Sequence, residues 1–196
     1  MTERKASIKR STAETQIELE LNIDGTGKGD IDTGVGFFDH MMTLLAKHAM
    51  FDLSIKAKGD THIDAHHTVE DIGICLGQAL AQAVGDKKGI SRYGFFLLPM
   101  DEALAQIALD LSGRPLMMWR AEIPFAKCGD FDSYLAREFM WAFCWNGGIN
   151  MHVDLMTARD PHHALEAIFK GVARSLRMAV AYDSREKGIP SSKGVL

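Results

Sequence analysis

Two histidine-rich motifs with the order His-His-x-x-Glu are the chemically most distinctive feature of the sequence. The first runs from His66 to Glu70 and the second from His162 to Glu166. Imidazole combined with carboxylate is a ligand set that suits manganese, iron or zinc. Neither motif contains cysteine, which favours a hard octahedral ion such as Mn²⁺ over a structural zinc. The duplication predicts a metal-binding function.

Each motif opens a predicted helix, and this placement decides how its side chains point. His67 and Glu70 are three residues apart and share one helix face, so they can bind the same ion. Adjacent residues on a helix point about 100° apart, so His66 must point elsewhere. We therefore expect each motif to serve two ions, with one histidine for each. The zinc-protease order His-Glu-x-x-His is absent, so hydrolysis through that motif is not supported.

Two further ligand candidates lie at matching positions of an internal repeat. The chain can be aligned on itself without gaps from His40 onward against Glu138 onward. A short deletion in a later loop then brings the first His-His pair onto the second. His40 lies on an otherwise apolar helix, and its match with Glu138 favours metal binding by both. His62 and His152 are interpreted as structural or surface residues.

The elements that position these residues follow from the hydrophobic pattern. In the first half, alternation predicts a strand over 17–23, a short strand ending near 35 and a strand over 53–57. Helical spacing predicts a helix over 37–50 and a long amphipathic helix that ends near 84, with Asp64 as its N-cap.

The second half repeats this order. Strands are predicted over 103–111, through 119 and over 149–155, and helices over about 132–145 and 162–182; an additional strand over 95–98 opens this half. The fold class is therefore α+β, built from a duplicated strand-strand-helix-strand-helix unit. Each half, 1–92 and 93–196, is expected to form a sheet with helices on one face, without a linker between the halves.

The composition limits the class of protein. The chain has 196 residues, 46% of them hydrophobic, and a net charge of -4, which argues against nucleic acid as the main partner. It has no apolar run of membrane-spanning length and no signal peptide at its start, so we expect a cytoplasmic protein with no membrane partner. The three cysteines form no C-x-x-C pair and are expected to be free, buried thiols.

Further motifs cover nearly the whole chain and fix a resemblance to a known family. They are Asp24–Gly27, Thr33–Met41, Asp64–Asp71, Arg92–Gly94, Pro99–Ala103, Asp110–Pro115, Gly129–Asp132, His162–Lys170 and Pro190–Leu196. As a set they resemble imidazoleglycerol-phosphate dehydratase of histidine biosynthesis in its monofunctional form. The fold that this implies is like domain 2 of ribosomal protein S5.

The resemblance implies two Mn²⁺ ions in each active site. One ion would be held by His40, His67, Glu70 and His162, and the other by His66, His163, Glu166 and Glu138. Many members of the family carry His where this chain has Glu138, so the second site would be harder and more anionic here. The resemblance also implies active sites between neighbouring chains, in a 24-subunit assembly built from trimers.

The implied reaction is that of a lyase, which dehydrates D-erythro-imidazole glycerol phosphate to imidazole acetol phosphate. A metal-stabilised imidazolate would expel the neighbouring hydroxyl, and a general base would remove the adjacent proton. Glu14 matches the family's substrate-contacting glutamate and is the candidate proton shuttle. The catalytic set implied by the resemblance is Glu14, His66, His162 and Lys170.

The substrate needs a cationic phosphate site as well. Positions that look like the family's phosphate-binding set are Arg92, Arg114, Lys170, Ser191, Ser192 and Lys193. Arginine binds phosphate through its bidentate fork and lysine as a point charge. The remaining substrate contacts are predicted to be His40, His48, His66, Glu70 and His162.

Two other functions fit the metal motifs alone. The first is a dinuclear metal phosphohydrolase, because paired ions also activate water. It would release inorganic phosphate, whereas the dehydratase yields a ketone and keeps the phosphate. The second is a non-enzymatic metal-binding shell or storage protein, for which Arg114 and Lys193 would not matter.

Overall fold

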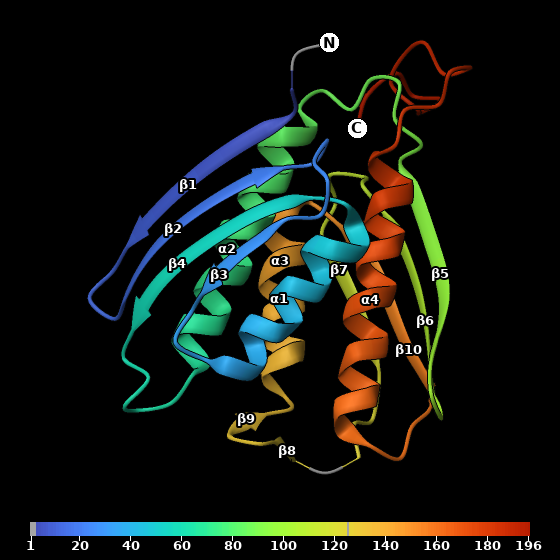
Figure 1. Ribbon diagram of the computed structural model, residues 1–196. Coiled ribbons are helices and arrows are strands. Elements are labelled where there is room, and N and C mark those ends of the chain that lie inside the picture. The colour runs from blue at the N-terminus through green and yellow to red at the C-terminus, as the bar shows by residue number, and fades with distance from the viewer. Residues whose placement is uncertain (1–2, 125) are drawn as a thin grey trace.

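A computed structural model describes residues 3–124 and 126–196 of the chain. It contains two four-stranded sheets with a layer of four helices between them (Figure 1). None of the described helices combines the length and the apolarity needed to cross a membrane.

The first sheet has the strand order β1-β2-β4-β3. Its strands are β1 (Lys5–Ser11), β2 (Thr15–Asn22), β3 (Gly29–Asp32) and β4 (Asp52–Gly59). All neighbours are antiparallel except β3 and β4, which run parallel. The helices that follow in this half are α1 (Gly36–Ala49) and α2 (His66–Val84).

The second sheet repeats the arrangement with the order β5-β6-β10-β7. Its strands are β5 (Tyr93–Met100), β6 (Ala103–Asp110), β7 (Leu116–Arg120) and β10 (Asn150–Thr157). Again one edge pair, β7 with β10, is parallel. The helices are α3 (Leu135–Gly147) and α4 (Pro161–Val180), and a small hairpin of β8 (Lys127–Cys128) and β9 (Phe131–Asp132) precedes α3.

The predicted α+β class with helices on one face of each sheet is confirmed, but the predicted unit lacked one strand. Strand β1 opens the first half as β5 opens the second, so each half has the order strand, strand, strand, helix, strand, helix. The burial pattern of β1 explains the omission. Ile8 is its one buried residue, because the strand lies at the sheet edge and its outer face is polar. Too few apolar positions remained for an alternating pattern.

The helix boundaries differ from the predicted ones by a few residues. Helix α3 begins at Leu135 rather than 132, because β9 and a turn occupy the residues before it. The N-cap of α2 is Ala65, not Asp64, although Asp64 Oδ1 still accepts a hydrogen bond from the His66 N–H at 2.8 Å.

The four helices form one continuous core with the inner faces of both sheets. Helix α2 packs on α3, and α1 packs on α4. Gly73 and Gly77, one turn apart on α2, permit a close approach, because a Cβ on Gly73 would lie 2.7 Å from the carbonyl oxygen of Phe139 on α3. Both histidine motifs therefore lie at the start of helices that pack against a helix of the other half of the chain.

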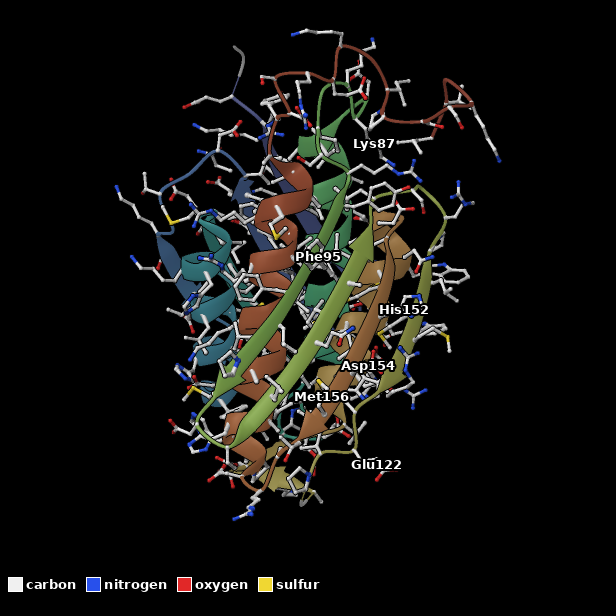
Figure 2. All side chains as sticks on the ribbon, turned by 90° about the vertical axis from the view of Figure 1, so that its right-hand side faces the viewer. Lys87, Phe95, Glu122, His152, Asp154 and Met156 are labelled. Atoms are coloured by element: carbon white, nitrogen blue, oxygen red, sulfur yellow. The ribbon has the colours of Figure 1, made fainter. Side chains whose placement is uncertain are left out.

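The outer sheet faces point away from this core. Figure 2 shows Phe95, His152 and Met156 on the outer face of the second sheet. His152 is half-buried there, and His62 is exposed in the loop before α2. Both positions agree with the interpretation of these histidines as structural or surface residues.

Candidate metal centre

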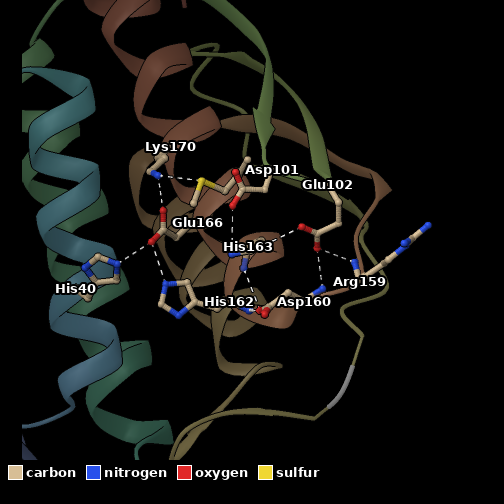
Figure 3. A network of polar contacts seen from close by, with 10 residues as sticks. His40, Asp101, Glu102, Arg159, Asp160, His162, His163, Glu166 and Lys170 are labelled. Atoms are coloured by element: carbon tan, nitrogen blue, oxygen red, sulfur yellow. Dashed lines mark hydrogen bonds and ion pairs between the residues drawn. The ribbon is translucent and has the colours of Figure 1, made fainter.

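The strongest group of metal-ligand candidates lies where α1 meets α4. His40 Nε2 and His162 Nε2 each lie 2.9 Å from Glu166 Oε1. One ligand atom from each of the three residues falls within a 4.8 Å group (Figure 3). Two imidazoles and one carboxylate at this spacing fit a divalent transition metal. The structure thus brings His40 from one half of the chain to the histidine motif of the other.

The start of α4 is built to present its histidines. Asp160 is the N-cap, and its Oδ1 accepts a hydrogen bond from the His162 N–H at 2.7 Å, while Pro161 occupies the first turn. A capping aspartate and an early proline both favour helix initiation at this point. His162 and Glu166 are then one turn apart on the same face, directed toward α1.

Glu166 is a buried carboxylate surrounded by nitrogen groups. Burial acts to raise the pKa of Glu166, but hydrogen bonds with Lys170, His40 and His162 overcome it and lower the pKa to about 2. Lys170 donates to the second carboxylate oxygen, Oε2. Glu166 is therefore ionised at neutral pH and ready to bind a cation.

A matching group lies where α2 meets α3, in the place that the repeat predicts. His66 Nε2 is 3.7 Å from Glu70 Oε2, and the Tyr134 hydroxyl is 3.5 Å from His66 Nδ1. Glu138, the counterpart of His40, lies one turn after Tyr134 and lines a hollow of about 170 Å³ with Trp141. The carboxylate of this second group is much more exposed than that of the first, with Glu70 at 46% and Glu166 at 9%.

The remaining two motif histidines contact carboxylates outside the motifs. His67 Nδ1 is 3.0 Å from Asp60 Oδ2, and His163 Nδ1 is 2.8 Å from Glu102 Oε2. The hydrogen bond with Asp60 raises the pKa of His67, and that with Glu102 raises the pKa of His163. The candidate proton shuttle Glu14 is also near, with Oε2 3.8 Å from His67 Nδ1.

The predicted ligand sets are distributed over several groups of one chain. Of the first set, His40 and His162 come together, whereas His67 lies with Asp60 and Glu70 lies with His66. Of the second set, Glu166 lies with His40, His163 lies with Glu102, and His66 and Glu138 both lie near Tyr134. The two four-ligand sets therefore stay predictions.

The predicted phosphate-binding residues other than Lys170 gather at the opposite end of the molecule. Arg92 donates to both oxygens of Asp110, at 2.6 and 2.9 Å, and to the carbonyl oxygen of Pro190. This bond with Asp110 raises the pKa of Arg92. The contact with Pro190 brings Arg92 next to Ser191, whose hydroxyl accepts a hydrogen bond from the Lys193 N–H.

Arg114 belongs to the same end, and so does Lys87, which no sequence motif indicated. Burial lowers the pKa of Lys87, as do the charges of Arg92 and Arg114, against the opposing effect of Asp110. We call this group of cations, Lys87, Arg92, Arg114 and Lys193, the basic end.

Two predicted substrate residues are placed elsewhere. Lys170 lies beside Glu166, where its ammonium also reaches Met100 Sδ at 3.4 Å, and not at the basic end. His48 is half-buried on α1, and burial lowers its pKa, with further lowering by the charges of Lys170 and Arg174. Both residues therefore lie along the α1–α4 contact.

Comparison with known proteins decides the family. A sequence profile described as imidazoleglycerol-phosphate dehydratase matches residues 33–176. The chain belongs to the imidazoleglycerol-phosphate dehydratase family. The prediction of a dehydratase, a hydro-lyase of histidine biosynthesis, is thereby confirmed, and the phosphohydrolase and metal-storage alternatives lose their support.

Whole-length relatives agree with this assignment. The chain is 58% identical over 194 residues to imidazoleglycerol-phosphate dehydratase of Roseobacter denitrificans, covering 98% of this chain and all of that protein. It is 55% identical to that of Methylorubrum extorquens, again with 98% of this chain and all of that protein covered.

Solved structures of the family share the fold. The Staphylococcus aureus dehydratase superimposes with a TM-score of 0.84 at 38% identity, covering 91% of this chain and 99% of that one. The Pyrococcus furiosus dehydratase also gives 0.84, at 35% identity, with 96% and 100% covered. The family is metal-dependent, in agreement with the group of His40, His162 and Glu166.

Proposed function

We propose that this dehydratase converts D-erythro-imidazole glycerol phosphate to imidazole acetol phosphate, with two Mn²⁺ ions at an active site shared between chains. The single observation that carries the shared site is the separation of the metal-ligand candidates from the basic end. His162 lies at the start of α4, whereas the Arg92 N–H donates to the carbonyl oxygen of Ala179 near its end.

This separation is too long for a small substrate. Seventeen helical steps from residue 162 to residue 179 span ~25 Å at the helical rise of about 1.5 Å per residue. One molecule of a small phosphate ester cannot reach the imidazole-binding and phosphate-binding groups of the same chain. A second chain, placed with its basic end near the first chain's metal ligands, would complete the site. Self-association into a 24-mer built from trimers would provide such contacts.

The donor sets support metal binding at this site. His40, His162 and Glu166 would hold one side of it, and the motif histidines and glutamates of a neighbouring chain would complete the coordination. Glu138 adds a further carboxylate, which favours a hard ion such as Mn²⁺. When bound, the metal supplies Lewis-acid polarisation of the substrate's imidazole ring.

The chain's own residues perform the remaining tasks. Arg92, Arg114 and Lys193 bind the phosphate and fix the substrate's position, assisted by the hydroxyls of Ser191 and Ser192. The reaction removes a proton from carbon, releases the adjacent hydroxyl as water, and returns a proton to carbon when the enol becomes a ketone.

Glu14 is the residue that we propose moves the proton. It lies in the turn between β1 and β2 and lines a hollow of about 310 Å³ together with Asp60 and His62. Its side chain is 54% exposed, so a carboxylate oxygen can reach a substrate held outside the chain. A carboxylate base in this position can accept the carbon-bound proton and deliver it again.

A metal-dependent turnover assay tests the proposed function. We expect purified protein with Mn²⁺ to convert imidazole glycerol phosphate to a ketone without releasing inorganic phosphate. Chelation should abolish turnover, and Mn²⁺ should restore it. Phosphate release without ketone would show that the reaction is hydrolysis and would contradict the proposal.

The proposal extends to the cellular compartment and to the origin of the internal repeat. We propose that the enzyme works in the cytoplasm, where histidine biosynthesis takes place. The repeat halves, 1–92 and 93–196, are proposed as the units from which the chain evolved by duplication, each contributing one sheet and one histidine motif.

A further inference from the structure

His67 and His163 each have one ring nitrogen engaged by a carboxylate that lies outside the histidine motifs. For His163 that carboxylate is Glu102, in the turn between β5 and β6 (Figure 3). The other oxygen of Glu102 accepts hydrogen bonds from the backbone N–H groups of Arg159 at 3.0 Å and Asp160 at 2.8 Å. Glu102 is thus fixed on both sides and holds the imidazole in one orientation.

Asp60 does the same for His67 in the first half. Its side chain is only 14% exposed, and Oδ2 lies 3.0 Å from His67 Nδ1. The second oxygen, Oδ1, is buried and has no hydrogen-bond partner in the described chain. A buried carboxylate is costly without donors, so the N–H of His67 is the group that stabilises it.

These contacts determine which nitrogen each imidazole can offer to a metal. A carboxylate that accepts a hydrogen bond from Nδ1 fixes the proton there and leaves the lone pair on Nε2. His163 Nε2 lies 3.6 Å from the exposed carboxylate of Asp101, which is beyond hydrogen-bond distance.

The two halves of the chain use carboxylates from different positions of the repeat to contact the Nδ1 atom of the motif histidine. Strands β2 and β6 both have eight residues, and aligning their first residues, Thr15 and Ala103, places Glu14 opposite Glu102. Yet Glu14 is 3.8 Å from His67 and more than half exposed, while Asp60 is in contact. Asp60 is the first residue after β4, whereas the first residue after β10 is Ala158, which has no carboxylate.

We propose that Asp60 and Glu102 are positioning residues that orient His67 and His163 for metal binding through Nε2. By taking this task in the first half, Asp60 leaves Glu14 free to act on the substrate. This inference rests on the proposed function, because it assumes that the motif histidines bind metal. It assigns different roles to two glutamates at equivalent positions of the repeat.

Metal affinity tests the inference without relying on activity. Asp60→Asn, Glu102→Gln and Glu14→Gln would each be titrated with Mn²⁺, and free Mn²⁺ would be followed by electron paramagnetic resonance. Loss of such an outer carboxylate should weaken Mn²⁺ binding about 10–100-fold in the first two variants. Glu14→Gln should bind Mn²⁺ as the wild type does while losing turnover. Asp30→Asn and Glu18→Gln, at exposed ion pairs with Lys56 and Lys9, are matched controls.

The outcomes separate the alternatives. Wild-type Mn²⁺ affinity in both Asp60→Asn and Glu102→Gln would overturn the inference. The inference would also be overturned if Glu14→Gln weakened Mn²⁺ binding as much as Glu102→Gln does. If Glu102→Gln does not fold, the two variants near His67 still test the inference. Asp60→Asn is expected to weaken Mn²⁺ binding, and Glu14→Gln is expected to leave it unchanged. A wild-type protein that binds Mn²⁺ but forms no ketone would refute the proposed function alone.

Discussion

At the scale of single residues, the site depends on carboxylates whose surroundings differ sharply. Glu166 is buried and held by an ammonium and two imidazoles. Glu102 is held by His163 and two backbone N–H groups, which lower its pKa to about 2. Glu14 is exposed at a turn, and its carboxylate is 3.8 Å from the nearest imidazole nitrogen, that of His67. The first two suit fixed roles in binding and positioning, and the third suits proton transfer.

Replacing Glu14 should therefore affect chemistry and not binding. We expect Glu14→Gln to lower kcat by about 10²–10⁴-fold, the usual contribution of a general base, with KM changed little. Steady-state turnover of imidazole glycerol phosphate at saturating Mn²⁺ measures both quantities. Glu18→Gln, on the adjacent strand, is the control. Residual activity near that of the wild type would remove Glu14 from the proton-transfer role.

The three cysteines should be chemically inert in the folded protein. All are free and buried, as the sequence predicted. Burial raises the pKa of Cys75 and Cys128 to about 11 and that of Cys144 to about 12. The thiolate is the reactive form, so at pH 8 very little of it is present. We expect a disulfide reagent to label none of them in native protein and all three after denaturation. Rapid labelling at pH 8 would contradict this burial.

Residue types and spacing could predict the metal-ligand candidates but not their partners. The repeated motif pointed to six residues and the internal alignment added His40 and Glu138, whereas the pairing of His40 with His162 followed from the family resemblance. Asp60, Glu102 and Lys87 were not predicted as site residues. A carboxylate or lysine in a loop has no periodicity, and only tertiary contacts show that it faces a histidine or a second cation.

At the scale of elements, the α2–α3 contact holds the second histidine group together. It depends on two glycines of α2 that face backbone atoms of α3. The sequence predicted these helices within a few residues, because their apolar faces are long and periodic. It missed β1, whose single buried residue gives no pattern. The close approach of two helices at a glycine likewise cannot be predicted from the sequence until the partner helix is known.

A substitution at this contact should be costly. In Gly73→Ala the new Cβ would lie 2.7 Å from the carbonyl oxygen of Phe139 and 2.9 Å from the Ala142 Cβ. Overpacking of this kind costs about 1–3 kcal/mol. Gly36→Ala is the control, because a Cβ there has no neighbour within 4 Å. Urea unfolding should show a lower free energy of unfolding for Gly73→Ala alone, and equal stability in the two variants would refute this packing.

At the scale of the whole molecule, the layered fold places the predicted metal ligands His162 and Glu166 and the basic end toward opposite ends of α4. The sequence predicted both sets of residues and the two-sheet architecture. It could not predict their separation, because this depends on the contact of the Arg92 loop with the end of α4. That distance is the physical reason for which we propose an active site shared between chains.

Mixing two inactive variants tests this account most directly. His162→Ala removes a predicted metal ligand, and Arg114→Ala removes a cation from the basic end without breaking the bonds of Arg92 to Asp110 and Pro190. Each variant alone should show almost no Mn²⁺-dependent dehydration of imidazole glycerol phosphate. After the two are dissociated, mixed and reassembled, some sites would receive intact metal ligands from one chain and an intact basic end from another. We predict that activity returns in the mixture; a mixture as inactive as its parents, with mixed oligomers present, would contradict the shared site.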